Sequence, residues 1–182
     1  MIDPKEREEA AMGLFHEGYN CCQSVVLAFA DVVKERTGMD ERQIKAVCSG
    51  FGGGFGRMRQ VCGSVSGMTF LAGVVCPADT GHSPFRMANY ALVQELAGAF
   101  REANGSIVCR ELLGLRAAAH QDPQTAPRDH TAVDAHGFPF ESPMPSERTE
   151  EYYRSRPCER LVGCAARIFA ERLNKEETNT RQ

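Results

Sequence analysis

The chain has 182 residues, which is enough for one domain with a hydrophobic core and too few for two ordinary domains. Its 21 basic and 24 acidic residues leave a net charge of −3, so no basic surface argues for binding to nucleic acid or to an anionic membrane. We therefore expect a single domain over residues 1–182, with small-molecule or electron chemistry left open.

The N-terminal residues predict a cytoplasmic protein. Met1-Ile2-Asp3-Pro4-Lys5-Glu6 carries charge and a proline where a secretory signal would have a basic stretch and then an apolar run. The most apolar stretch, residues 61–76, is shorter than the ~20 residues that a membrane-spanning helix needs. We expect this stretch to be a buried helix, with no membrane insertion.

Helix caps in chain order predict an all-α fold, a compact bundle of about six to seven helices. Asp3 with Pro4, Asn20 with Gln23, and Asp40 with Gln43 are N-cap and capping-box patterns that precede apolar helical periods. The predicted helices are 4–16, 21–35, 40–48, 61–76, 85–102, 106–114, with Ser106 as cap, and 157–174, and the tail 175–182 is expected to fray.

Two segments between these helices have no regular helical pattern. Residues 50–56 contain five glycines within seven positions, and each glycine costs a helix about 1 kcal/mol relative to alanine. The predicted structure is a tight loop whose backbone closely approaches another group. Residues 116–148 are polar and rich in proline, which predicts an arm that is extended or partly disordered.

Eight cysteines are many for a chain of this length. A reducing compartment disfavours structural disulfides, so metal binding or thiol chemistry becomes the leading explanation. We assign half of the cysteines to core packing: Cys22, Cys48, Cys76 and Cys164. If one of these four has a chemical role instead, we expect it to be Cys22.

The other four cysteines, Cys21, Cys62, Cys109 and Cys158, each fall in the first turn of a predicted helix. Unpaired N–H groups and the positive end of the helix dipole favour an anion there, which lowers a thiol pKa from about 8.5 toward neutrality. A thiolate is both a nucleophile and a metal ligand. These four are therefore the candidate catalytic and metal-binding residues.

The glycine loop lacks the lysine and the preceding strand of a phosphate-binding loop. It is better suited to bring backbone N–H groups to the Cys62 sulfur or to an inorganic ligand. The candidate cofactor-binding positions are Gly52, Gly53, Gly54 and Gly63.

The sequence lacks the motifs of histidine metal sites, covalent haem and thioredoxin-type dithiols. The histidines share no metal-binding spacing and are expected to be ordinary side chains: His16, His82, His120, His130 and His136. The chain has no Cys-x-x-Cys-His for covalent haem and no Cys-x-x-Cys for a thioredoxin-type dithiol.

Five segments resemble, in order, the C-GCAxxG-C-C family of redox-active proteins, over about residues 13–170. They are residues 20–25, 50–57, 62–67, 109–114 and 158–162. The family hallmark is a CGAxxG motif plus four invariant cysteines, which fall on Cys21, Cys62, Cys109 and Cys158; Ser64 stands where the motif has alanine. The resemblance implies redox activity. Some relatives are joined to c-type haem segments and are able to hold an iron–sulfur centre, which this haem-free chain could share.

Three hypotheses remain open from the sequence. The preferred one is a thiolate-bound metal or iron–sulfur centre for electron transfer, with [2Fe–2S] the expected form and zinc using the same ligands. The second is metal-free thiol–disulfide chemistry, in which a cysteine such as Cys62 attacks and a neighbour resolves. The third is a structural or interaction protein. The redox partner is unknown, and Gly63 and Gly67 on one helix face suggest a homodimer seam, although the same face could pack within one chain.

Overall fold

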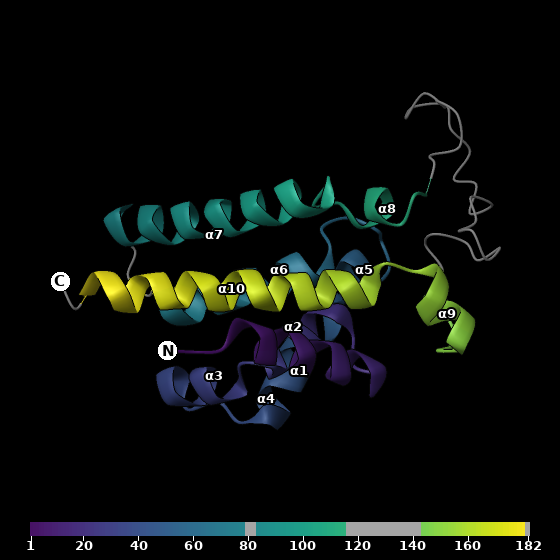
Figure 1. Ribbon diagram of the computed structural model, residues 1–182, viewed down its shortest axis with the longest axis horizontal. Coiled ribbons are helices and arrows are strands. Elements are labelled where there is room, and N and C mark those ends of the chain that lie inside the picture. Colours follow the sequence, from purple (N-terminus) through teal and green to yellow (C-terminus); the bar gives the residue numbers. More distant parts are fainter. Residues whose placement is uncertain (79–82, 116–142, 181–182) are drawn as a thin grey trace.

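In the computed structural model, which describes residues 1–78, 83–115 and 143–180, the N-terminal helices begin at the predicted caps (Figure 1). Asp3 accepts a hydrogen bond from the Lys5 N–H at the start of α1 (Pro4–His16). Capping boxes, in which the cap and the residue three positions later satisfy each other, open α2 (Cys21–Leu27) and α4 (Glu41–Cys48).

The predicted helix 21–35 is wrong as one element, because the chain breaks between α2 and α3 (Ala30–Thr37). The break frees the carbonyl oxygen of Ala28, which accepts a hydrogen bond from Arg7 Nη1 at 2.6 Å. Phe29, fully buried at the break, packs edge-on against Phe169 with ring centroids 5.0 Å apart. Tertiary contacts from α1 and α10 thus interrupt a helix that the local apolar pattern would continue.

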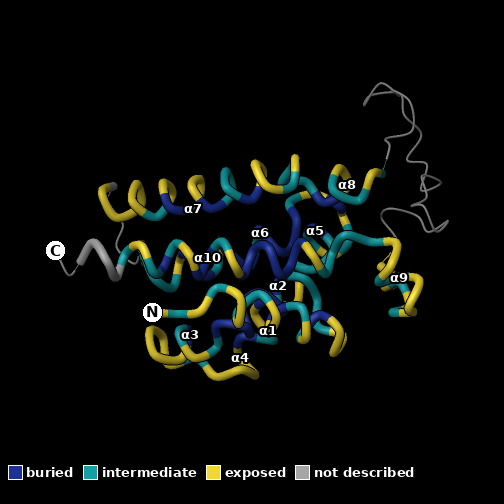
Figure 2. Tube along the Cα trace, viewed as in Figure 1, coloured by how far each residue is buried: buried dark blue, intermediate teal, exposed yellow. Residues whose placement is uncertain are grey.

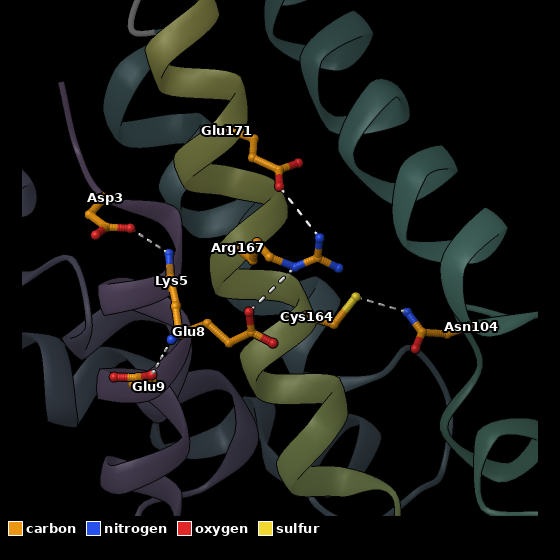
Figure 3. A network of polar contacts seen from close by, with 8 residues as sticks. All are labelled: Asp3, Lys5, Glu8, Glu9, Asn104, Cys164, Arg167 and Glu171. Carbon is orange, nitrogen blue, oxygen red and sulfur yellow. Dashed lines mark hydrogen bonds and ion pairs between the residues drawn. The ribbon is translucent and has the colours of Figure 1, made fainter.

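The long helices form the frame of the bundle. In Figure 1, α10 (Cys158–Thr180) runs between α7 (Ser83–Asn104) and α1, with α6 (Gly63–Val75) close to it. Helix α1 packs along α10, and α6 packs against both α2 and α7. An ion pair of 3.4 Å joins Arg167 on α10 to Glu8 on α1 (Figure 3).

The core lies where these helices meet. Figure 2 shows α6, together with the inward faces of α2 and α10, among the most buried segments. The largest fully buried side chains include the aromatic and aliphatic residues Phe15, Phe29, Phe100, Phe169, Met68 and Leu71. The buried helix predicted for residues 61–76 is α6, which begins at Gly63 and ends at Val75.

Several other boundaries differ from the prediction. Helix α8 (Cys109–Leu112) begins three residues after Ser106, whose hydroxyl instead accepts the Val108 N–H. Helix α9 (Glu150–Ser155) was not predicted, and α10 continues to Thr180 where fraying was expected from residue 175. Most of the predicted arm, residues 116–142, lies outside the described residues.

The glycine-rich segment forms two very short turns, η1 (Ser49–Phe51) and α5 (Gly52–Phe55). The described residues contain no β-strand; Val61 and Val108 form an isolated antiparallel bridge. No helix in the described ranges is both long and apolar enough to cross a membrane.

Candidate functional site

Four cysteines from distant parts of the chain line one cavity of about 430 Å3. Cys62 is the N-cap of α6, and the other three, Cys21, Cys109 and Cys158, are the first residues of α2, α8 and α10. Figure 1 shows α5, α8 and the start of α10 at the same end of the molecule. The four cysteines that the sequence singled out therefore meet in space, and all are free thiols.

Cys21 and Cys158 are in direct contact. The hydrogen bond between their thiols is the main cause of a raised pKa at Cys21, and burial adds to it. Two groups act in the opposite direction by favouring the thiolate, the Arg148 guanidinium and the backbone N–H of Gly53. Because the pKa is raised on balance, Cys21 is a neutral thiol in this structure at ordinary pH.

Cys62 and Cys109 lie deeper in the protein. Burial raises the pKa of Cys62 to about 12, and the neighbouring Cys21 and Cys109 add to the rise. Burial also raises the pKa of Cys109, against the opposing charge of Arg59. Ser64, in place of the motif alanine, lies close enough to favour the Cys62 thiolate, yet its buried Oγ makes no hydrogen bond among the described residues.

These pKa values correct one sequence-based expectation. The positions of Cys21, Cys62 and Cys109 at helix starts predicted lowered values, and the structure gives raised values at all three. A helix start is worth typically 0.3–1 kcal/mol to an exposed charge, roughly a pKa unit or less, whereas full burial shifts a pKa by up to about 3–5 units. The reactive thiolate would therefore need a further positive group or a metal to form.

The predicted glycines approach the site closely. Gly52, Gly53 and Gly63 line the cavity. A Cβ atom on Gly63 would lie 3.0 Å from the Cβ of Cys21, so a side chain there would push on the thiol pair. Gly54, the fourth predicted position, is not a lining residue, but it has φ +71° and its Cβ would lie 2.8 Å from the Cβ of Cys109. The loop is glycine-rich because its backbone must touch the cysteine-bearing helices.

Backbone hydrogen bonds hold the end of this loop against α8. The Cys109 N–H donates to the carbonyl of Gln60 at 2.6 Å, and the Cys62 N–H donates to the carbonyl of Ile107 at 2.8 Å. Cys62 and Cys109, 47 positions apart in the chain, are thus fixed near each other by main-chain contacts.

Four arginines at the cavity were not identified as site residues from the sequence: Arg57, Arg59, Arg148 and Arg156. The described residues that line the cavity include no aspartate or glutamate. Arg57 and Arg59 lie between the glycine loop and Cys62 in the sequence, and Arg156 lies two residues before Cys158. This closeness to the cysteines was the sequence signal that could have identified them. The charged side chains among the described lining residues are therefore all basic, in a protein whose net charge is −3.

Residues 143–148, the described end of the predicted arm, close one side of the cavity. Pro143, Pro145, Ser146 and Arg148 are all lining residues. Arg148 donates to the carbonyls of Phe15 and Tyr19 at 2.9 and 3.1 Å, and its guanidinium lies 4.2 Å from the centre of the Phe15 ring. This anchor on the α1 end holds the segment over the cysteines.

The remaining cysteines do not line the cavity. Cys22 and Cys48 are fully buried and share a hydrogen bond, which with burial raises the pKa of Cys22. Cys164 is buried on α10, where its Sγ accepts a hydrogen bond from Asn104 Nδ2 at 3.3 Å (Figure 3). Cys76 ends α6 and is half-buried. Cys22 and Cys48 thus form a second thiol pair, which the sequence did not predict.

The four cysteines line one cavity, but their side chains are not arranged to hold a metal ion in this structure. Among residues 1–78, 83–115 and 143–180, no three histidine, cysteine, aspartate or glutamate side chains are arranged to hold a metal ion. His16 lies at the surface beside Glu159, 3.0 Å away. The other four histidines, His82, His120, His130 and His136, are outside the described residues.

Comparison with protein families gives a match over most of the chain. The family model described as "Putative redox-active protein (C_GCAxxG_C_C)" matches residues 19–172, which include all four cavity cysteines. Neither a comparison with curated proteins nor one with solved structures found a match.

Proposed function

This chain belongs to the C_GCAxxG_C_C family of redox-active proteins, and on that premise we propose that its redox centre is an iron–sulfur centre in the four-cysteine cavity. Cys21, Cys62, Cys109 and Cys158 would hold it as thiolates. The observation that carries the proposal is that four thiols from four helix starts line one cavity of about 430 Å3.

The donor set suits such a centre. Iron–sulfur clusters are held by four cysteine thiolates, and hydrogen bonds and charges around the sulfurs set their potential. Here the Gly53 N–H points to the Cys21 sulfur, and arginine side chains lie near Cys21 and Cys109. A zinc ion would use the same four thiolates, with each sulfur about 2.3 Å from the metal.

The protein's own residues would prepare the site in three ways. The cysteines must lose their protons on binding, and the arginines offset the negative charge that results. The glycine loop brings N–H groups within reach of sulfur. Tyr152, Pro143 and Pro145 add less polar surface to the cavity wall. The bound centre would supply one-electron transfer.

The contact between Cys21 and Cys158 supports a second candidate, metal-free dithiol chemistry. Joining the two sulfurs in a disulfide would release two electrons and two protons to an external oxidant. Cys62, named from the sequence as the attacking thiol, is less suited because its pKa of about 12 leaves it protonated. This candidate does not account for the other two thiols or for the open space.

The test is anaerobic purification followed by assays for iron, acid-labile sulfide and visible absorption. We expect a brown protein with iron and sulfide bound, and we expect Cys62→Ala and Cys109→Ala each to lose both, because a closed four-ligand centre loses a ligand. Cys76→Ala is the matched control, since Cys76 lies outside the cavity, and it should keep the full content.

Three outcomes would contradict the iron–sulfur proposal, and the last of them is bound zinc. One is a colourless protein without iron that forms a Cys21–Cys158 disulfide on mild oxidation, which would favour the dithiol. Another is Cys62→Ala with undiminished iron and sulfide. Bound zinc in a stoichiometric amount would make the centre a structural metal site.

A cytoplasmic location, an unidentified redox partner and a homodimer belong to the same proposal. The glycine face that suggested a dimer seam packs inside this chain, because Cβ atoms on Gly63 and Gly67 would lie 3.0 and 2.8 Å from the Cβ atoms of Cys21 and Val25 on α2. The dimer therefore needs another surface, and light scattering on the purified protein tests it directly.

A further inference from the structure

Arg59 carries a buried charge that the cysteines alone do not explain. Only 4% of the residue is exposed, and its Nε and Nη2 atoms have no hydrogen-bond partner among the described residues. Burying a cation with unpaired N–H groups costs several kcal/mol. A side chain kept in this state next to a cavity points to an anion that occupies the space.

The surroundings of Arg59 add positive charge. Arg57 Nη1 and Arg156 Nη2 both donate to Ser146 Oγ, each at 3.4 Å, so these two guanidinium groups converge on one side of the cavity. Arg59 and Arg156 also lie close enough to Cys109 to favour its thiolate. The lining residues that the structure describes include no aspartate or glutamate.

We propose that the cavity binds a small oxyanion of the sulfate or phosphate class on the free Nε–Nη2 edge of Arg59, next to Cys109. These two N–H groups point in parallel and match two oxygens of one anion, the bidentate geometry in which arginine binds phosphate and carboxylate most strongly.

The cavity has room for such a ligand. Its volume of about 430 Å3 compares with about 30 Å3 for one water molecule in the liquid, so a small anion fits beside the cysteine-bound centre. The anion site adds a ligand class to the cavity in which we propose the iron–sulfur centre. It rests on that proposed function only because the two would share one cavity.

Isothermal titration calorimetry with inorganic sulfate and phosphate tests the site, at an ionic strength held constant with chloride. The titration is run on the reduced metal-free protein and on the protein with its iron centre. We expect saturable binding in both forms. Arg59→Lys keeps the charge but loses the paired N–H groups, so binding should weaken about 10- to 100-fold. Arg59→Met should abolish it.

Arg101→Met is the control, because Arg101 is an exposed arginine on α7 that does not line the cavity. It should bind the anions as the parent protein does, and circular dichroism should show all variants folded. If Arg59→Met were unfolded, Arg59→Lys would carry the test.

Three results would overturn the inference: no binding to the parent protein, equal loss in Arg101→Met, or binding only to the metal-free form, which would mean that Arg59 serves the sulfur centre. Iron and sulfide assays on the same samples separate the two proposals. If the parent protein holds iron but binds no anion, only the anion-site proposal fails. If it holds no iron but still binds sulfate, only the iron–sulfur proposal fails.

Discussion

Two opposing effects act on the thiol of Cys62. Its place at the start of α6 favours the thiolate through the N–H groups of the first turn, and its burial disfavours any charge. The structure shows that burial dominates, with a pKa raised from 9.0 to about 12. Position along a helix is visible in a sequence, but the degree of burial depends on which helices pack over it.

This raised pKa makes stability depend on pH in the metal-free, reduced protein. Above pH 9 the unfolded chain releases the Cys62 proton while the folded protein keeps it, so stability is fully present below pH 9 and is lost as pH rises toward 12. Between pH 8 and 10, Cys62 should contribute a loss of about 1.4 kcal/mol in the free energy of unfolding.

Urea unfolding at the two pH values measures this loss. Cys62→Ala should lower the pH dependence by about that amount, and Cys76→Ala, outside the cavity, is the comparison variant. An unchanged pH dependence in Cys62→Ala would show that the thiol ionises normally in the fold.

Helix α6 illustrates what an element's sequence can and cannot specify. Its small residues, spaced four apart, predicted a face that allows close packing, and two partners were open, a second chain or another helix of the same chain. The structure places α2 there, with Gly67 against Val25. The choice depends on the whole arrangement of helices, since any backbone of suitable shape could fill that face.

Two glycines of α6 give a matched pair for testing this contact. In Gly67→Ala the new Cβ would lie 2.8 Å from the Cβ of Val25, so overpacking should destabilise the protein by about 1–3 kcal/mol. Gly73 is exposed, and a Cβ atom added there would have no neighbour within 4 Å, so Gly73→Ala should stabilise by up to about 1 kcal/mol through helix propensity alone. Denaturant unfolding measures both, and equal effects would show that α6 does not pack closely on α2.

At the scale of the whole molecule, the two ends of the chain are joined. Ile2 N–H donates to Asn174 Oδ1 at 2.8 Å, and Asn174 Nδ2 donates to the Ile2 carbonyl at 2.7 Å. Figure 1 shows the N-terminus and the last described turns of α10 at the end opposite α5 and α8. This pair fastens the start of α1 to α10, whose first residue, Cys158, lines the cavity at the other end of that helix.

Asn174→Ala should remove both hydrogen bonds and lower the free energy of unfolding by about 1–2 kcal/mol. Hydrogen exchange should show a faster-exchanging Ile2 amide, while the cysteine site at the far end stays intact. Lys175→Ala, an exposed neighbour, is the control and should leave exchange at Ile2 unchanged.

The sequence by itself determined the local features: the capping boxes at Asn20 and Asp40, the tight glycine loop, the all-α class and the four cysteines that begin helices. These depend on neighbours in the chain, where a cap or a glycine acts within a few residues. The break after Leu27, the extent of α10 and the helix α9 were not predicted, since packing overrides or supplements such weak local preferences.

Only the tertiary structure decided how the cysteines are used. It brought Cys21 against Cys158, buried Cys62 enough to reverse its expected pKa shift, and surrounded the cavity with arginines from three segments. Contacts between residues more than a hundred positions apart leave no trace in local pattern, and burial and charge compensation exist only once the helices have packed.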